Sequence, residues 1–201
     1  MKWYKYDIRD LSDTEYIKWY SLMSKENQNR VERFRFVDDK KRTVAGEMLA
    51  RIAISAWCNV SPESIVFNKS KNGKPFAEGL DVEFNISHSH DMVVCAVSDK
   101  PIGIDIEKIR PINLNVAKRI CTKDELAYLF GHEPNDADFN QKPDNTTLTR
   151  FFEIWTAKEA YVKCIGTGIG DIKHDTGKSK NDIYCFDNYV ICVSPSEKAS
   201  S

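Results

Sequence analysis

Apolar residues recur at helical spacing in two long stretches of the chain. Between residues 39 and 58 they follow the three-and-four spacing of a buried helix face: Ala45, Met48, Leu49, Ile52 and Ala56. Residues 151–163 predict a second helix, with one apolar stripe formed by Phe151, Ile154, Trp155, Val162 and Ile165. Two more helices are expected, one from a capping box at residues 12–15 to about residue 36 and one over residues 115–130.

Other segments have the patterns typical of strands. Residues 102–107 alternate three isoleucines with polar residues, and residues 92–97 are an unbroken apolar run. Shorter strands are expected at residues 3–8, 64–68, 84–90 and 188–194, with a hairpin at Lys71-Asn72-Gly73. Residues 131–149 are polar and rich in turn formers, which predicts a surface loop, and residues 171–182 predict a hydrophilic connector.

The order of these elements repeats. Residues 91–98 and 188–194 resemble each other weakly, and each follows a helix, a short strand and a polar turn. We therefore expect an α+β fold, a pseudo-dimer of two similar lobes at residues 1–101 and 102–201, with a site at the seam between them.

Lys158 lies inside the apolar stripe of the helix at residues 151–163. An unpaired buried charge is costly, so this lysine must either extend its ammonium group to water or bind an anion. Glu159 and Lys163, four residues apart, are neighbours on an adjoining face. A lysine reaching solvent and a surface ion pair would be enough to explain this helix by itself.

Two acids share one face of the strand at residues 102–107. The alternation places Asp105 and Glu107 about 6.6 Å apart along the strand. Two such carboxylates repel unless a cation lies between them or water surrounds both. A few oxygen ligands suit Mg²⁺, whereas an exposed strand face with solvated acids is an equally good explanation. Glu159 could supply a third carboxylate.

Composition limits the possible partners. The 201 residues include 29 basic and 30 acidic ones, for a net charge of −1, so no overall charge attracts the chain to nucleic acid or to an anionic membrane. The six cysteines form no C-x-x-C pair and are expected to be reduced. The longest apolar run is too short to span a bilayer, and residues 1–6 lack the apolar core of a signal peptide, so we expect a cytoplasmic protein.

Basic residues nevertheless cluster locally, at Arg30, Arg33, Arg35, Lys40, Lys41 and Arg42. The cluster is either a solvated helix end or the rim of a pocket for a phosphate ligand. Pro75 restricts the backbone of Lys74 and so fixes where that lysine points. Ser87 and His88, which we expect on a strand adjacent to the acidic one, either satisfy local backbone groups or hold phosphate oxygens.

Several of these segments resemble motifs of one enzyme family. Residues 103–107 (Gly-Ile-Asp-Ile-Glu) and 155–163 (Trp-Thr-Ala-Lys-Glu-Ala-Tyr-Val-Lys) resemble the two signature motifs of the 4′-phosphopantetheinyl transferase superfamily. Gly73-Lys74-Pro75, residues 84–89 and Arg42-Thr43 resemble accessory motifs of its two-lobed, surfactin-synthetase-activating branch. The resemblance covers residues 25–170. It implies Mg²⁺-dependent transfer of the phosphopantetheine arm of coenzyme A to a serine of an acyl or peptidyl carrier protein, with release of adenosine 3′,5′-bisphosphate.

The resemblance also implies a role for each matching residue. Mg²⁺ would bind Asp105, Glu107 and Glu159, and Glu159 would also be the candidate base for the carrier serine. Lys158 and Lys163 would stabilise the pyrophosphate and the leaving group, with Lys163 a possible proton donor. The other coenzyme A ligands would be Ser87 and His88 for phosphates and Arg30, Arg42, Thr43 and Lys74 for the 3′-phosphate and adenine end.

The chain departs from the family pattern at two places. Asn27-Gln28-Asn29 replaces a basic residue that family members often have, so adenosine-side affinity would rest on Arg30, Arg33 or Lys74. The segment after Gly170 is also short for the branch.

Two other functions would use some of the same residues. Another Mg²⁺-dependent phosphotransferase or hydrolase could act on a nucleotide through the same three acids. A non-catalytic coenzyme A-binding module would need Lys74, Ser87 and His88 but not three acids. If the protein is a transferase, an acidic carrier protein is expected to dock near Lys118 and Arg119. A monomer is expected, because two lobes that build their own cleft need no second subunit.

Overall fold

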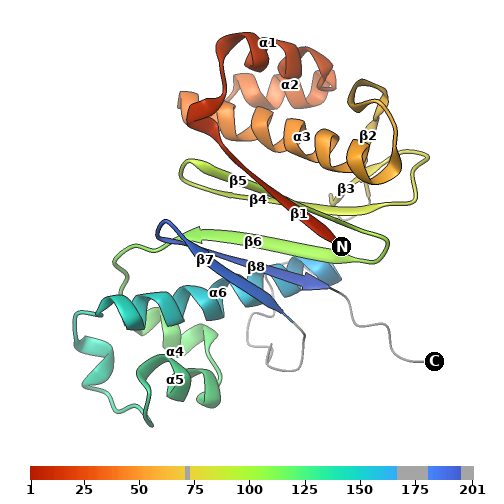
Figure 1. Ribbon diagram of the computed structural model, residues 1–201. Coiled ribbons are helices and arrows are strands. Elements are labelled where there is room, and N and C mark those ends of the chain that lie inside the picture. Colours follow the sequence, from red (N-terminus) through yellow and green to blue (C-terminus); the bar gives the residue numbers. More distant parts are fainter. Residues whose placement is uncertain (71–72, 167–180, 196–201) are drawn as a thin grey trace, which may run out of the picture.

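Two three-stranded antiparallel sheets pack face to face in the computed structural model, which describes residues 1–70, 73–166 and 181–195 (Figure 1). The first sheet has the order β1-β5-β4, with β1 at Lys2–Asp7, β4 at Glu83–Ser89 and β5 at Met92–Ser98. The second has the order β6-β8-β7, with β6 at Ile102–Lys108, β7 at Asp182–Phe186 and β8 at Tyr189–Pro195. Both sheets therefore have the same strand order, and the predicted α+β fold is confirmed.

A long helix covers the outer face of each sheet. Helix α3, at Val37–Cys58, lies on the first sheet with α1 at Asp13–Leu22 and α2 at Lys25–Glu32 beside it (Figure 1). Helix α6, at Asn145–Ile165, lies on the second sheet, next to the short helices α4 at Ala117–Ile120 and α5 at Lys123–Phe130. The described residues also contain 3-10 turns at Ile8–Asp10, Pro62–Ser64, Leu114–Val116 and Asp138–Asn140.

The core between the sheets explains the alternation in the acidic strand. Ile102, Ile104 and Ile106 of β6 are buried against apolar residues of β5 and β8, such as Val94 and Ile191. The opposite face of β6 lies against α6, and so the polar residues of the strand are enclosed between a sheet and a helix. The boundary that we propose between the lobes, at residues 101 and 102, falls in the turn between β5 and β6.

Two helices that the sequence pattern predicted as continuous are interrupted. The one predicted for residues 12–36 breaks at Met23, which is extended, and Ser24 caps α2 by accepting the Asn27 N–H. The one predicted for residues 115–130 breaks at Cys121, and Thr122 starts α5 with a capping box. These local hydrogen bonds compete with the continuing helix and end it.

Other boundaries also differ from the prediction. Helix α6 begins at Asn145, six residues earlier than expected, because Asp144 caps it. The predicted strand at residues 64–68 is β2 at Phe67–Lys69, which pairs with β3 at Pro75–Ala77. The short strand expected before residues 188–194, for which the sequence pattern gave no bounds, is β7. Lys71, Asn72 and most of the connector predicted at residues 171–182 lie outside the described residues.

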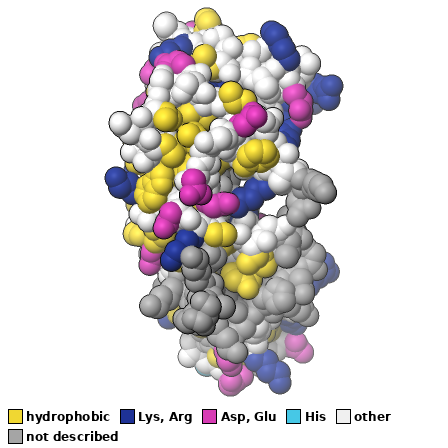
Figure 2. Space-filling model, turned by 90° about the vertical axis from the view of Figure 1, so that its right-hand side faces the viewer, with side chains coloured by type: hydrophobic (Ala, Val, Ile, Leu, Met, Phe, Trp, Pro, Cys, Tyr) yellow, Lys and Arg dark blue, Asp and Glu magenta, His cyan; other side chains and the backbone are white. Residues whose placement is uncertain are grey.

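The surface carries no large area of one charge sign on the coloured part of the face in Figure 2, where acidic and basic side chains alternate and hydrophobic ones gather over the upper lobe. This agrees with the nearly zero net charge. Within the described residues, no helix is both long and apolar enough to cross a membrane.

Candidate active site

Asp105 is enclosed between β6 and α6. Its side chain is only 5% exposed, and its Oδ1 accepts hydrogen bonds from Lys163 Nζ at 2.6 Å and Ser87 Oγ at 2.7 Å. Oδ2 is buried and has no hydrogen-bond partner among the described residues. Burial raises the pKa of Asp105, whereas Lys163 and Ser87 oppose that rise. Of the two explanations for this strand face, solvated acids are therefore excluded at Asp105.

Glu107 lies on the same face of β6 but nearer to solvent. Its Oε2 accepts hydrogen bonds from Ser89 Oγ at 3.1 Å and Arg110 Nη1 at 2.7 Å. Glu107 and Asp105 are close enough for the charge of Glu107 to raise the pKa of Asp105. The predicted pairing of the two acids on one face is thus present in the fold.

Glu159 joins these acids from α6. It is half-buried, and burial raises its pKa, as do the charges of Asp105 and Glu107, while Lys163 lowers it. The predicted neighbours Glu159 and Lys163 thus face the acidic strand together. We call Asp105, Glu107, Glu159 and Lys163 the acidic cluster.

The oxygen donors of this cluster are of the kind that Mg²⁺ prefers, and the buried Oδ2 of Asp105 has no partner among the described residues that a cation would have to replace. The described residues do not, however, bring three acidic, histidine or cysteine side chains as close together as a bound metal ion requires. Lys163 occupies the space beside Asp105 that a cation would take. The donor atoms therefore suit Mg²⁺ in their chemistry, while in the arrangement described the positive charge beside Asp105 is that of Lys163.

Lys158 does not belong to the acidic cluster, contrary to expectation. Its side chain is 1% exposed, and its ammonium group forms an ion pair with Glu125 of α5 at 2.9 Å. A lysine in an apolar stripe needs an anion or water, and here the anion comes from the protein itself. This pairing argues against a contact between Lys158 and the pyrophosphate.

A cleft of about 270 Å³ lies between α2, α3, the β2–β3 hairpin and β4. It contains four residues that the resemblance assigned to coenzyme A: Arg30, Arg42, Thr43 and His88. Lys74 is not among the lining residues, although Gly73 and Pro75 are, and its ammonium group pairs with Glu83 at 3.0 Å. Ser87, one residue before His88, points to the acidic cluster instead, because successive side chains of a strand face opposite sides.

Arg42 is held in place at the cleft. Its Nη1 donates to the carbonyl oxygen of His90 at 2.7 Å, and its Nη2 donates to Asp39 at 2.6 Å.

Burial lowers the pKa of His88, and the positive charges of Arg42 and Lys163 lower it further. His88 therefore lies within electrostatic reach of both the cleft and the acidic cluster.

Sequence reasoning missed several residues of this site. Asn27 and Glu47 line the cleft and are joined by a hydrogen bond of 3.0 Å, and Glu47 also pairs with Arg51. An acid and a base four apart within an apolar helix could have indicated this buried pair. Arg110, which holds Glu107, lies outside every motif and gave no signal.

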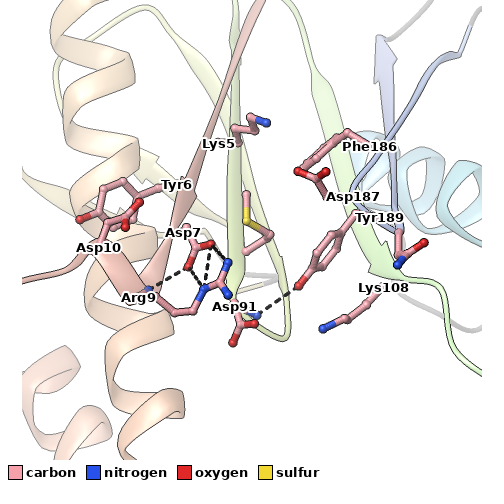
Figure 3. Close-up of a pocket in the computed structure, with 12 residues that line it drawn as sticks. Lys5, Tyr6, Asp7, Arg9, Asp10, Asp91, Lys108, Phe186, Asp187 and Tyr189 are labelled. Atoms are coloured by element: carbon pink, nitrogen blue, oxygen red, sulfur yellow. Dashed lines mark hydrogen bonds and ion pairs between the residues drawn. The ribbon is translucent and has the colours of Figure 1, made fainter.

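A larger hollow of about 550 Å³ opens elsewhere at the seam, between the end of β1 and the β7–β8 hairpin (Figure 3). Its charged groups include Arg9, which pairs with Asp7, and its aromatic wall includes Tyr189, whose hydroxyl accepts the Asp91 N–H at 3.4 Å. None of the predicted site residues lines it. Size alone therefore does not identify the functional site.

Comparisons with known proteins cover both lobes. Residues 10–100 match the family model described as 4′-phosphopantetheinyl transferase, N-terminal, and residues 101–186 match that of the 4′-phosphopantetheinyl transferase superfamily. The chain is 40% identical over 149 residues to 4′-phosphopantetheinyl transferase gsp of Aneurinibacillus migulanus, which covers 74% of this chain and 58% of the relative. It is 36% identical over 165 residues to 4′-phosphopantetheinyl transferase Sfp of Bacillus subtilis (strain 168), which covers 82% of this chain and 69% of the relative.

A more distant match has the same name. The chain is 33% identical over 161 residues to 4′-phosphopantetheinyl transferase HetI of a Nostoc species, covering 76% of this chain and 63% of the relative. In these three comparisons the matched region spans between 58% and 69% of the relative's length. The signature residues on β6 and α6, the two-lobed fold and these matches agree, and the chain belongs to the 4′-phosphopantetheinyl transferase superfamily.

Proposed function

We propose that this protein transfers the 4′-phosphopantetheine arm of coenzyme A to a serine of an apo acyl or peptidyl carrier protein and releases adenosine 3′,5′-bisphosphate. The main supporting observation is that β4 joins the cleft to the acidic cluster: Ser87 donates to Asp105 at 2.7 Å, and the next residue, His88, lines the cleft together with Arg42. Coenzyme A carries phosphates at two separate places, the 3′-phosphate and the pyrophosphate. A ligand with this spacing of charges suits a basic cleft next to an acidic cluster.

The cleft takes the adenosine end in this proposal. Arg30, Arg42, Thr43 and Lys74 bind the 3′-phosphate and the adenine side, and the ion pair between Lys74 and Glu83 opens to free the lysine. His88 donates a hydrogen bond to a phosphate oxygen as a neutral imidazole, since its pKa is lowered. Ser87 orients Asp105 rather than binding phosphate, because its hydroxyl donates to Oδ1.

The acidic cluster takes the pyrophosphate. Asp105, Glu107 and Glu159 would hold Mg²⁺, which would supply positive charge to offset the negative charge that develops on the pyrophosphate oxygens. Lys163 leaves Asp105 and binds the phosphate oxygens instead. Its ammonium group therefore pairs with Asp105 when coenzyme A is absent and with the phosphates when coenzyme A is bound. Both states keep the buried carboxylate of Asp105 next to a positive charge.

Glu159 is the base in this scheme. The carrier serine Oγ attacks the phosphorus on the pantetheine side, a P–O bond forms, and the bridging P–O bond breaks with its electron pair leaving on adenosine bisphosphate. Glu159 accepts the serine proton. Burial raises the pKa of Glu159 in the cation-free protein, which makes it a stronger base than an exposed carboxylate, whereas a bound cation would oppose that rise.

The proposed partner docks on the second lobe. Lys118 and Arg119 of α4 are exposed, next to the exposed apolar side chain of Val116, although Lys118 already pairs with Asp136. An acidic carrier protein would compete with Asp136 for Lys118. We further propose a cytoplasmic monomer. One chain supplies both the cleft, which the first lobe lines, and the acidic cluster of the second lobe, which Ser87 and Ser89 of the first lobe contact.

Intact-protein mass spectrometry tests the transfer. An apo carrier protein incubated with coenzyme A, Mg²⁺ and this protein should gain the mass of one phosphopantetheine. Turnover of coenzyme A without a carrier would support another phosphotransferase or hydrolase instead, and binding without turnover would support a non-catalytic module. Within the same helix, E159Q should abolish transfer, whereas E153Q, which removes a charge bonded to Tyr128, should keep it.

A further inference from the structure

Strand β4 contacts β6 without a backbone ladder between them. The two strands belong to different sheets, and three alternating side chains of β4 join them. Asn85 Oδ1 accepts the Ile104 N–H at 3.0 Å, and Ser87 Oγ donates to Asp105 Oδ1 at 2.7 Å. Ser89 Oγ donates to Glu107 Oε2 at 3.1 Å, accepts the Lys108 N–H at 3.1 Å and lies at the longer distance of 3.4 Å from His90 Nδ1.

All three joining side chains are almost fully buried. Asn85, Ser87 and Ser89 are 9%, 6% and 8% exposed. They share one face of β4 because side chains of a strand alternate with a period of two. Their partners follow one another along β6, from Ile104 through Asp105 to Glu107. The polar face of β4 thus runs alongside the acidic face of β6, with one hydroxyl for each acid.

Each hydroxyl takes one oxygen of its carboxylate and leaves the other. Ser87 bonds to Oδ1 of Asp105, whose Oδ2 has no partner among the described residues. Ser89 bonds to Oε2 of Glu107, and in the part of the chain that the structure describes Oε1 receives no hydrogen bond. A carboxylate held by one oxygen presents the other in a fixed direction.

We propose that Ser89 is a positioning residue for the acidic cluster: its hydroxyl, anchored by the Lys108 N–H, turns Glu107 so that Oε1 faces the cation site. Arg110 contacts the same Oε2, but its side chain is 46% exposed, so water and salt weaken its hold. Ser89 is the buried contact and therefore determines the direction of the carboxylate. This inference rests on the proposed function, since it assumes that Glu107 binds a divalent cation.

Binding of Mn²⁺, followed by electron paramagnetic resonance on the purified protein, tests this without relying on activity. Groups that orient a metal ligand typically contribute a factor of about 10–100 to metal affinity. S89A should therefore bind Mn²⁺ at least about 10-fold more weakly than the unmodified protein. S89T keeps the hydroxyl and should restore the affinity. The Mg²⁺ concentration for half-maximal transfer should rise in S89A, with the KM for coenzyme A unchanged.

Ser98 of β5 provides the matched control. It is 5% exposed, accepts the Lys100 N–H at 3.2 Å and donates to Asp99 at 3.3 Å. It therefore also accepts a backbone N–H and donates to a carboxylate, but at the other end of the sheet, opposite Glu83 of β4. S98A should lower the unfolding temperature about as much as S89A and leave Mn²⁺ binding unchanged. If S89A folds poorly, S89C offers a weaker donor of similar size and should bind Mn²⁺ more weakly than S89T.

Three results would overturn the inference. The first is a folded S89A, or S89C, that binds Mn²⁺ as tightly as the unmodified protein. The second is an equal loss of Mn²⁺ affinity in S98A, which would make the effect a general loss of stability. The third is an unmodified protein that neither binds Mn²⁺ nor transfers phosphopantetheine, and only this one would also overturn the proposed function.

Discussion

Gly103 of β6 lies directly against Ala160 of α6: a Cβ on Gly103 would be 1.8 Å from the carbonyl oxygen of Ala160. This close approach brings α6 near enough for Lys163 to reach Asp105, two residues farther along β6, at 2.6 Å. The distance between the acidic strand and the helix that carries Glu159 is therefore determined by the absence of one side chain.

Replacing Gly103 by alanine should push α6 away from β6. We expect the free energy of unfolding to fall by about 3 kcal/mol, at the upper end of the range for overpacked sites. Denaturant unfolding followed by tryptophan fluorescence measures this. In the control G46A, the new Cβ on α3 would meet Ile86 Cγ2 of β4 at 3.4 Å, an ordinary van der Waals contact, and stability should stay the same or rise. Equal stability of G103A and the unmodified protein would contradict the close approach.

The buried pair of Lys158 and Glu125 should behave as one unit. E125Q keeps the size of the side chain but leaves a lysine that is 1% exposed without its carboxylate, so we expect a loss of about 3–5 kcal/mol. The double variant E125Q/K158M should recover most of that stability, because it removes both charges. Denaturant unfolding of the single and double variants measures the coupling. Additive losses would show that the two side chains do not depend on each other.

Arg30 should contribute to coenzyme A binding, whereas Arg33 should not. Both are exposed near the end of α2, but only Arg30 lines the cleft. A hydrogen bond to a charged group contributes about 1.5–3 kcal/mol, so R30A should raise the KM for coenzyme A about 10-fold or more with little change in kcat. R33A should leave both constants unchanged. Steady-state kinetics at saturating carrier protein distinguishes the two variants, and equal KM values would remove the cleft from the proposed site.

The pKa of Asp105 has a consequence for stability. Burial raises it above the ordinary value of 3.8, so the folded chain still holds a proton at pH values where the unfolded chain has released it. Stability therefore falls as pH rises from 3.8 through the raised pKa, because the native state binds more protons. An asparagine side chain does not titrate, so D105N should gain stability relative to the unmodified protein over that interval. Unfolding in the presence of a metal chelator at a series of pH values measures the stability of D105N relative to the unmodified protein. A gain that shrinks with rising pH would contradict the prediction, because it would mean that the native state binds fewer protons than the unfolded state.

The sequence could predict the elements whose pattern is regular. The isoleucine alternation of β6 and the apolar spacing of α3 reflect backbone geometry alone, and both elements are present. The same geometry could have predicted that Ser87 and His88 point to opposite sides of β4 and so do not contact the same group, because successive side chains of a strand alternate. The helix breaks at Met23 and Cys121 were missed because short caps at Ser24 and Thr122 override a pattern that continues across them.

By itself, the sequence determined that Asp105 and Glu107 share one face of a strand and that Glu159 and Lys163 share one face of a helix, because those relations span only two and four residues. The tertiary structure decided what each charge faces. Lys158 and Lys163 lie five residues apart on one helix, yet the first pairs with Glu125 and the second with Asp105. Such pairings join separate elements, and they depend on how closely those elements pack, which here depends on Gly103.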